Sequence, residues 1–129
     1  MTEQENTPTI VVLIRDLFFS VKVKNELANA GYEPLLVKRE PELLSTVESS
    51  NPSLVLLDLN AKPDWDALEP LLSSESGPPV LAFGPHKDVE ARRTAQAAGV
   101  TRVVTNQQLH KSLHEYVGRY AAESPSGQS

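Results

Sequence analysis

The sequence of 129 residues contains no cysteine, and its basic residues are few, with 12 Lys and Arg against 17 Asp and Glu. Without cysteine there is no disulfide framework, no thiolate nucleophile and no Cys-ligated metal, so core packing must stabilise the fold. Nucleic-acid affinity rests largely on clustered Lys and Arg. The formal net charge of -5 therefore argues against a surface that follows a phosphate backbone.

Long apolar runs are absent as well. No run approaches the roughly 20 residues that a membrane span needs, and no charged-then-apolar signal segment opens the chain, so a cytoplasmic location is expected. Neither GxGxxG nor GxxxxGK[ST] occurs, which leaves nucleotide binding without support.

The composition fits a single globular domain. Hydrophobic residues make up 40% and charged residues 22%, which is ordinary usage, and the length suits one core. Residues 1–8 and 121–129 are polar, small or rich in Pro and Gly, and we predict that they are disordered ends of a domain spanning 9–120. Without Glu3, Glu5 and Glu123, the rest of the chain has 14 acidic and 12 basic residues and is nearly neutral.

Short apolar runs recur along this domain and are continuous rather than alternating. This pattern is typical of parallel strands that helices bury on both faces. The predicted strands are Thr9–Ile14, Pro34–Val37, Leu54–Leu59, Val80–Phe83 and Arg102–Thr105.

Helical patterns occupy the intervals between the runs. Each begins or ends at a residue that suits a helix terminus, such as Pro at a first position, Asp at an N-cap or Gly at a C-terminus. The first predicted helix is 19–30, ending at Gly31, and the second runs from Pro41 to the SSNP segment 49–52. The third begins at a capping box of Asp66 and Glu69 and is restricted by Pro70, and the fourth is alanine-rich and runs from Asp88 to Gly99. The fifth begins at about Asn106 and has an apolar stripe of Leu109, Leu113, Tyr116, Val117 and Tyr120.

Five alternations of strand and helix predict a doubly wound α/β fold of the flavodoxin-like type. We expect a five-stranded parallel sheet in the order 2-1-3-4-5, with five helices. The functional crevice of such a sheet lies beside the loops after the first and third strands, at the carboxyl ends. The residues to examine are Arg15, Asp16, Asp58 and Asn60.

Several segments resemble the receiver domain of response regulators, the CheY-like family, over 9–120. LVLLDLNAK resembles the third strand, IVVLIRD the first strand and acidic turn, NAGYEPLLV the second strand, and AQAAGVTRVVT the fourth helix and fifth strand. The resemblance places Asp58 where receivers accept a phosphoryl group.

The resemblance also implies that most of the partners of that aspartate have been replaced. Receivers hold Mg²⁺ through an acidic pair, which here reads Arg15-Asp16, or Ile14-Arg15 with a shift of one residue, so Asp16 and Asp58 are the remaining metal-supporting acids. Three further receiver positions are a hydroxyl residue, a lysine and an aromatic switch residue. They are occupied by Gly84, Asn106 and Val103 respectively.

We therefore expect an atypical, stand-alone receiver-like domain that is not an enzyme, binds no cofactor and acts through a protein partner without phosphorylation. By family analogy the contact surface is the fourth helix, the fifth strand and the last helix. One alternative is a working phosphoacceptor at Asp58 that uses Mg²⁺, Asp16 and a substitute cation from Lys62 or Lys87. Another is a flavodoxin-like domain that binds a small ligand or cofactor.

Simpler interpretations of the same residues are also open. Asp58 can cap a loop and Asp16 can cap the first helix, with Arg15 in a structural ion pair beside them. His110 and His114 are spaced like a metal pair but have no third ligand, so a solvated helix face is expected. We expect Trp65 to pack under its loop rather than anchor a partner. Arg92, Arg93 and Arg102 can form a small positive patch, although a few surface arginines are ordinary.

Overall fold

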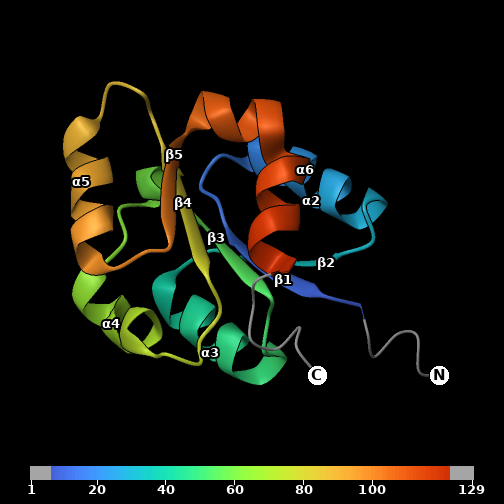
Figure 1. The fold of residues 1–129 in the computed structure, drawn as a ribbon, viewed down its shortest axis with the longest axis horizontal. Coiled ribbons are helices and arrows are strands. Elements are labelled where there is room, and N and C mark those ends of the chain that lie inside the picture. The colour runs from blue at the N-terminus through green and yellow to red at the C-terminus, as the bar shows by residue number, and fades with distance from the viewer. Residues whose placement is uncertain (1–6, 123–129) are drawn as a thin grey trace.

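The fold is a parallel sheet between two layers of helices (Figure 1), given by a computed structural model that describes residues 7–122. The strand order is β2-β1-β3-β4-β5 and each neighbouring pair is parallel, which confirms the predicted topology. The strands are β1 (Thr9–Leu13), β2 (Glu33–Val37), β3 (Leu54–Asp58), β4 (Val80–Gly84) and β5 (Arg102–Thr105).

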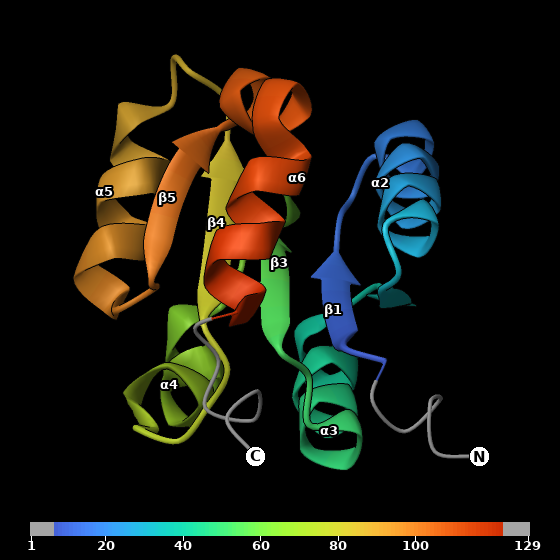
Figure 2. The same ribbon diagram turned by 45° about the vertical axis from the view of Figure 1, so that its right-hand side comes forward.

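Five α-helices and one 3₁₀ turn lie between or after the strands of the described chain. They are α2 (Leu17–Asn29), α3 (Glu40–Ser50), η1 (Leu59–Ala61), α4 (Trp65–Ser73), α5 (Val89–Ala98) and α6 (Asn106–Ala122). Helices α2 and α6 pack on one face of the sheet and α3, α4 and α5 on the other, so that β5 lies between α5 and α6 (Figure 2).

The strands have continuous apolar runs because helices cover both faces of the sheet. Successive strand side chains point to opposite faces of a sheet. On β1, Ile10 and Val12 therefore join the cluster beneath α2 and α6, while Val11 and Leu13 join the cluster beneath α3, α4 and α5. Both faces need apolar residues, so no polar alternation develops.

Helix ends largely follow the predicted signals. The Asp16 carboxylate accepts a hydrogen bond from the Phe19 N–H at 3.0 Å and caps α2, and Asp88 caps α5 in the same way. Gly99 ends α5 in the left-handed conformation, φ 107°. The predicted start of α4 was wrong: Asp64, not Asp66, is its N-cap and accepts from the next turn's N–H groups.

The last helix carries its predicted stripe inward, with Leu109, Leu113, Val117 and Tyr120 buried. It is not continuous, because Ser112 leaves helical geometry at φ -130° and ψ 36°. It also runs two residues beyond the predicted domain boundary, to Ala122. The predicted tails 1–6 and 123–129 lie outside the described residues. Within 7–122, none of the helices combines the length and apolarity of a membrane span.

Candidate functional site

Asp58 is the last residue of β3 and lies at the carboxyl edge of the sheet, between two loops. Its Oδ2 accepts the peptide N–H of Arg15 at 2.9 Å, and its Oδ1 accepts the peptide N–H of Asn60 at the same distance. Only 3% of the residue is exposed. Asp58 therefore links the β1–α2 loop to the start of η1. The structure contains the loop-capping contact that the simpler interpretation of this residue describes.

Burial is the dominant influence on the Asp58 carboxyl and raises its pKa, because a desolvated carboxylate is disfavoured. The two peptide N–H groups oppose this by stabilising the charged form, the negative charge of Asp16 adds to it, and the positive charge of Arg15 has the smallest effect. The charges of Asp16 and Arg15 thus do not offset the free-energy cost of removing the Asp58 carboxylate from water.

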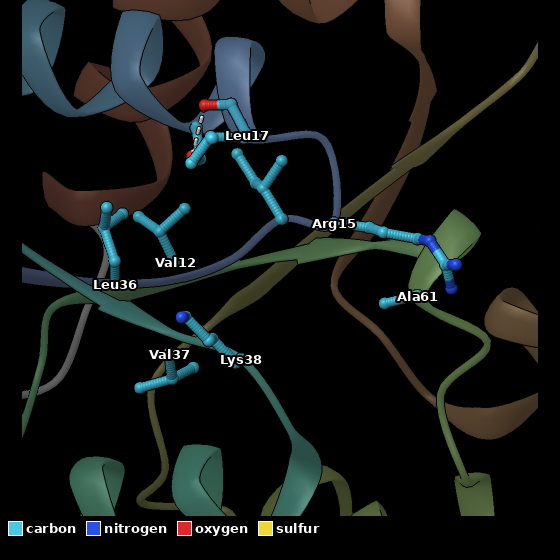
Figure 3. A pocket seen from close by; sticks show the side chains of 9 residues that line it. Val12, Arg15, Leu17, Leu36, Val37, Lys38 and Ala61 are labelled. Atoms are coloured by element: carbon cyan, nitrogen blue, oxygen red, sulfur yellow. Dashed lines mark hydrogen bonds between the residues drawn. The ribbon is translucent and has the colours of Figure 1, made fainter.

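The predicted ion pair of Arg15 with Asp58 and Asp16 was wrong. Across residues 7–122 the salt bridge present is Lys22 with Glu26 on α2. The contact from Arg15 to Asp58 comes from the main chain, whereas its side chain extends toward Ala61 (Figure 3). A peptide N–H is available from any non-proline residue. The identity of residue 15 therefore matters little for this contact.

A cleft of about 480 Å³ opens above Asp58, lined also by Arg15, Asp16, Asn60 and Lys62. The described residues contain no group of three His, Cys, Asp or Glu side chains placed to hold a metal ion. Mg²⁺ is bound by one or two carboxylates together with water and phosphate oxygens. Here one of the two carboxylates is buried and bonded through both oxygens, the other caps a helix, and two cationic side chains share the cleft. Two carboxylates are enough acid for Mg²⁺, and the two cationic side chains beside them oppose its binding.

Gly84, at the receiver hydroxyl position, faces a side chain that sequence reasoning missed. A Cβ on Gly84 would lie 3.1 Å from both Cβ and Cδ1 of Leu59, which is closer than side chains normally pack. Leu59 follows Asp58 directly and is itself buried. A side chain at this position of β4 would therefore require Leu59 to shift by a few tenths of an ångström. The signal in the sequence was an apolar residue immediately after the strand-end aspartate.

Asn106 begins α6 immediately after β5, at the same edge of the sheet. Its Oδ1 is buried and has no hydrogen-bond partner, which costs free energy because the oxygen has lost water without replacement. Val103 on β5 is partly buried and packs against the cluster beneath α5. Strand pairing sets Phe83 beside Asp58 and Thr105 beside Gly84, so the predicted site residues do gather at one edge.

The remaining residues of interest lie outside this cleft. His110 is exposed and stacks on Phe19 with ring centroids 4.1 Å apart, and the irregular Ser112 interrupts the helix between it and His114. Trp65 is partly buried against the core, as predicted. Two of the three arginines that could have formed a positive patch have separate partners. Arg92 donates to the carbonyls of Pro85 and His86, while Arg102 donates to the Tyr120 hydroxyl and lies over the Tyr116 ring.

No family model and no curated relative matches the sequence. Solved receiver-type structures match its fold. A response regulator from Thermotoga maritima has a TM-score of 0.74 at 19% identity, covering 90% of this chain and 98% of that one. The receiver domain of NtrX from Brucella abortus has 0.75 at 18%, covering 90% and 99%. The signal receiver domain of a histidine kinase from Syntrophus aciditrophicus has 0.79 at 15%, covering 92% and 93%.

These likenesses extend over nearly the whole described chain and over nearly the whole of each receiver domain. With the strand order and the five helices, they establish the flavodoxin-like, CheY-like architecture of receivers. At such low identity they establish the fold and not the activity.

Proposed function

We propose that this chain is an atypical receiver-like domain of signal transduction that acts by binding a protein partner, without phosphorylation of Asp58 and without enzymatic activity. The observation that carries the proposal is the state of Asp58. It is buried, bonded through both oxygens to peptide N–H groups, and in no ion pair in the described structure.

Phosphoryl transfer to a carboxylate depends on charges and donors arranged in advance around the transferring group. By the receiver resemblance, a metal-binding acid, a hydroxyl and a lysine are replaced here by Arg15, Gly84 and Asn106. The loss of one such contact costs about 3–4 kcal/mol when measured for single oxyanion donors. Even with non-additive effects, three losses bring self-phosphorylation below a useful rate.

Packing supports the same conclusion. Leu59 occupies the space beside Gly84 where a phosphoryl-binding side chain would start. Each Asp58 oxygen also accepts one peptide N–H, so a phosphoryl group bonded to either oxygen would crowd an existing hydrogen bond. This arrangement is more typical of a carboxylate that holds two loops together than of an exposed nucleophile.

The alternative of a working phosphoacceptor is favoured by one observation, the presence of Lys62 in the cleft above Asp58. Lys87, the other suggested cation, is exposed in the loop before α5 and does not line that cleft. For the partner-binding surface, analogy with receivers points to α5, β5 and α6, and that assignment stays a prediction.

The test is incubation of the purified chain with a small acyl phosphate and Mg²⁺, followed by intact-mass measurement. We expect no added phosphoryl group. Asp58→Asn is the matched control, because it keeps the side-chain shape and removes the nucleophile. A gain of one phosphoryl mass in the wild type that is missing in Asp58→Asn would establish the phosphoacceptor alternative instead.

A further inference from the structure

A cavity of about 280 Å³ lies where α4 and α5 end, at the edge of the sheet opposite Asp58. Its wall is formed by the loop that follows α4 and by the turn that follows α5, and it includes Glu75, Gly77, Gly99 and Thr101. The C-terminal end of α5 lies beside α4 in both ribbon views (Figures 1 and 2). None of the residues that line this cavity belongs to the cleft above Asp58.

Main-chain oxygens at the end of α4 lie beside this cavity. A Cβ built on Gly77 would be 3.3 Å from the Leu71 carbonyl oxygen, and one built on Gly99 would be 3.9 Å from the Leu72 carbonyl oxygen. Within residues 7–122 neither oxygen accepts a hydrogen bond: the C-cap Ser74 donates none to α4, and the Gly77 N–H donates to the Ser74 carbonyl instead. Two hydrogen-bond acceptors are therefore available to a ligand.

The charges around this cavity have one sign. Among the described residues that line it, Glu75 is the one with a charged side chain, and it is exposed. The C-terminus of a helix carries a partial negative charge, and neither α4 nor α5 has a basic residue in its last turn to neutralise it. A carboxylate and the ends of two helices therefore favour a positively charged ligand and disfavour an anion.

Part of the cavity wall is apolar. Leu72, Pro78 and Pro79 are partly buried and line it together with the buried residues Leu71 and Val80. A bare metal ion gains nothing from such a surface, and the described residues do not place three acidic or histidine side chains together for one. A ligand with an aliphatic stem and a positively charged end uses both parts of the wall, as lysine side chains do at protein surfaces.

We propose that this cavity binds a primary ammonium group carried on a short aliphatic stem. The stem lies against Leu72 and Pro79, and the ammonium donates to the main-chain oxygens of Leu71 and Leu72 and to the Glu75 carboxylate. An ammonium has three N–H donors, which equals the number of these acceptor groups. A lysine side chain of another protein and a free diamine both have this chemistry. The site goes beyond the proposed function and does not depend on the state of Asp58.

The test is a titration of the isotopically labelled full chain with n-butylammonium chloride, followed through the amide signals by NMR. We expect saturable shifts at Gly77, Gly99 and Thr101. Much smaller shifts are expected from n-butanol, which has the stem without the charge, and from ammonium chloride, which has the charge without the stem. Equal shifts with n-butanol, ammonium chloride or KCl at the same concentration overturn the proposal, as does the absence of saturable shifts.

Variants of Glu75 test its part in binding. Glu75→Gln should weaken the affinity for n-butylammonium about threefold, which is typical of the loss of one exposed ion pair. Glu75→Lys should abolish saturable binding. The matched control is Glu115→Gln, which makes the same change of net charge at an exposed residue of α6 outside the cavity and should leave the affinity unchanged. Equal weakening by Glu75→Gln and Glu115→Gln, or no weakening by Glu75→Gln, contradicts the proposed site.

Two further ligands distinguish the possible sources of the ammonium group. Nα-acetyl-lysine-N-methylamide presents it as a protein side chain does, and cadaverine presents it as a free diamine. Tighter binding of the capped lysine assigns the site to a lysine of a partner protein. Tighter binding of cadaverine, after allowance for its two ammonium groups, assigns it to a small amine. If neither ligand shifts the same amides as n-butylammonium, the site binds the probe only and the proposal is overturned.

Discussion

Leu59 packs against the backbone of Gly84 so closely that a Cβ added there would come within 3.1 Å of two Leu59 carbons. The two residues stand at the ends of neighbouring strands, one directly after Asp58 and the other at the end of β4. The small residue and the large one are therefore complementary, and together they close the side of the site where receivers carry a hydroxyl group.

This complementarity predicts a coupled effect on stability. Gly84→Ala should destabilise the fold by about 1–3 kcal/mol through overpacking against Leu59. In a Leu59→Ala background the same substitution should cost less, with a coupling of at least about 0.5 kcal/mol. Urea unfolding of the wild type, the two single variants and the double variant measures the coupling. Because Leu59→Ala keeps Cβ and removes Cδ1, additive costs would show that the Leu59 Cδ1 does not crowd the space beside Gly84.

The buried carboxyl of Asp58 predicts a particular dependence of stability on pH. Because burial raises its pKa in the folded state above the ordinary 3.8, the folded chain holds this proton to a higher pH than the unfolded chain does. The contribution of Asp58 is therefore fully present below that ordinary value and is lost as pH rises through the folded-state pKa. The free energy of unfolding of the wild type, relative to Asp58→Asn, should fall over that interval.

Denaturant unfolding of both proteins across the acidic to neutral range measures this difference. Asp58→Asn also leaves one of the two peptide N–H groups without an acceptor, which adds a cost of about 1–3 kcal/mol that does not vary with pH. The sign of the pH trend is thus the informative quantity. A relative stability that rises with pH would mean that cations, and not burial, control Asp58.

Asp16 is predicted to act as a helix cap rather than as a metal ligand. Asp16→Ala removes the acceptor of the Phe19 N–H and should destabilise the chain by about 1 kcal/mol, whereas Asp16→Asn, which can still cap, should cost much less. Addition of Mg²⁺ should leave the thermal midpoint of the wild type unchanged, because only a bound ligand stabilises the folded state. An Mg²⁺-dependent rise that Asp16→Asn abolishes would assign a metal to this residue.

The sequence was sufficient to predict the fold because periodicity and helix termini agreed for most of the elements. Continuous runs such as 54–59 indicated doubly covered strands, and Gly31 and Gly99 marked the ends of two helices. The start of α4 was misplaced because Asp64 and Asp66 are both good capping residues, and only the path of the chain after η1 selects Asp64. The interruption at Ser112 could not be predicted, because the spacing of the apolar residues of α6 does not change there.

The sequence was enough to predict which residues lie at the site, but not which contacts their side chains make. Strand order alone brings Asp58, Gly84 and Asn106 to one edge, as expected. The direction of the Arg15 side chain depends on the course of the β1–α2 loop, which no sequence pattern specifies, and the predicted ion pair was wrong for that reason. The packing of Leu59 over Gly84 joins residues that are far apart in sequence, so it required coordinates.

The central claim is that Asp58 is a buried structural carboxylate and not a phosphoacceptor, and the most direct measurement is its state in the cell. The protein is extracted from growing cells by rapid acid quenching and separated on a gel that retards phosphorylated proteins, beside Asp58→Asn prepared in the same way. The account predicts one band with the same mobility in both samples. A slower wild-type band that hydroxylamine removes, and that Asp58→Asn lacks, would contradict it.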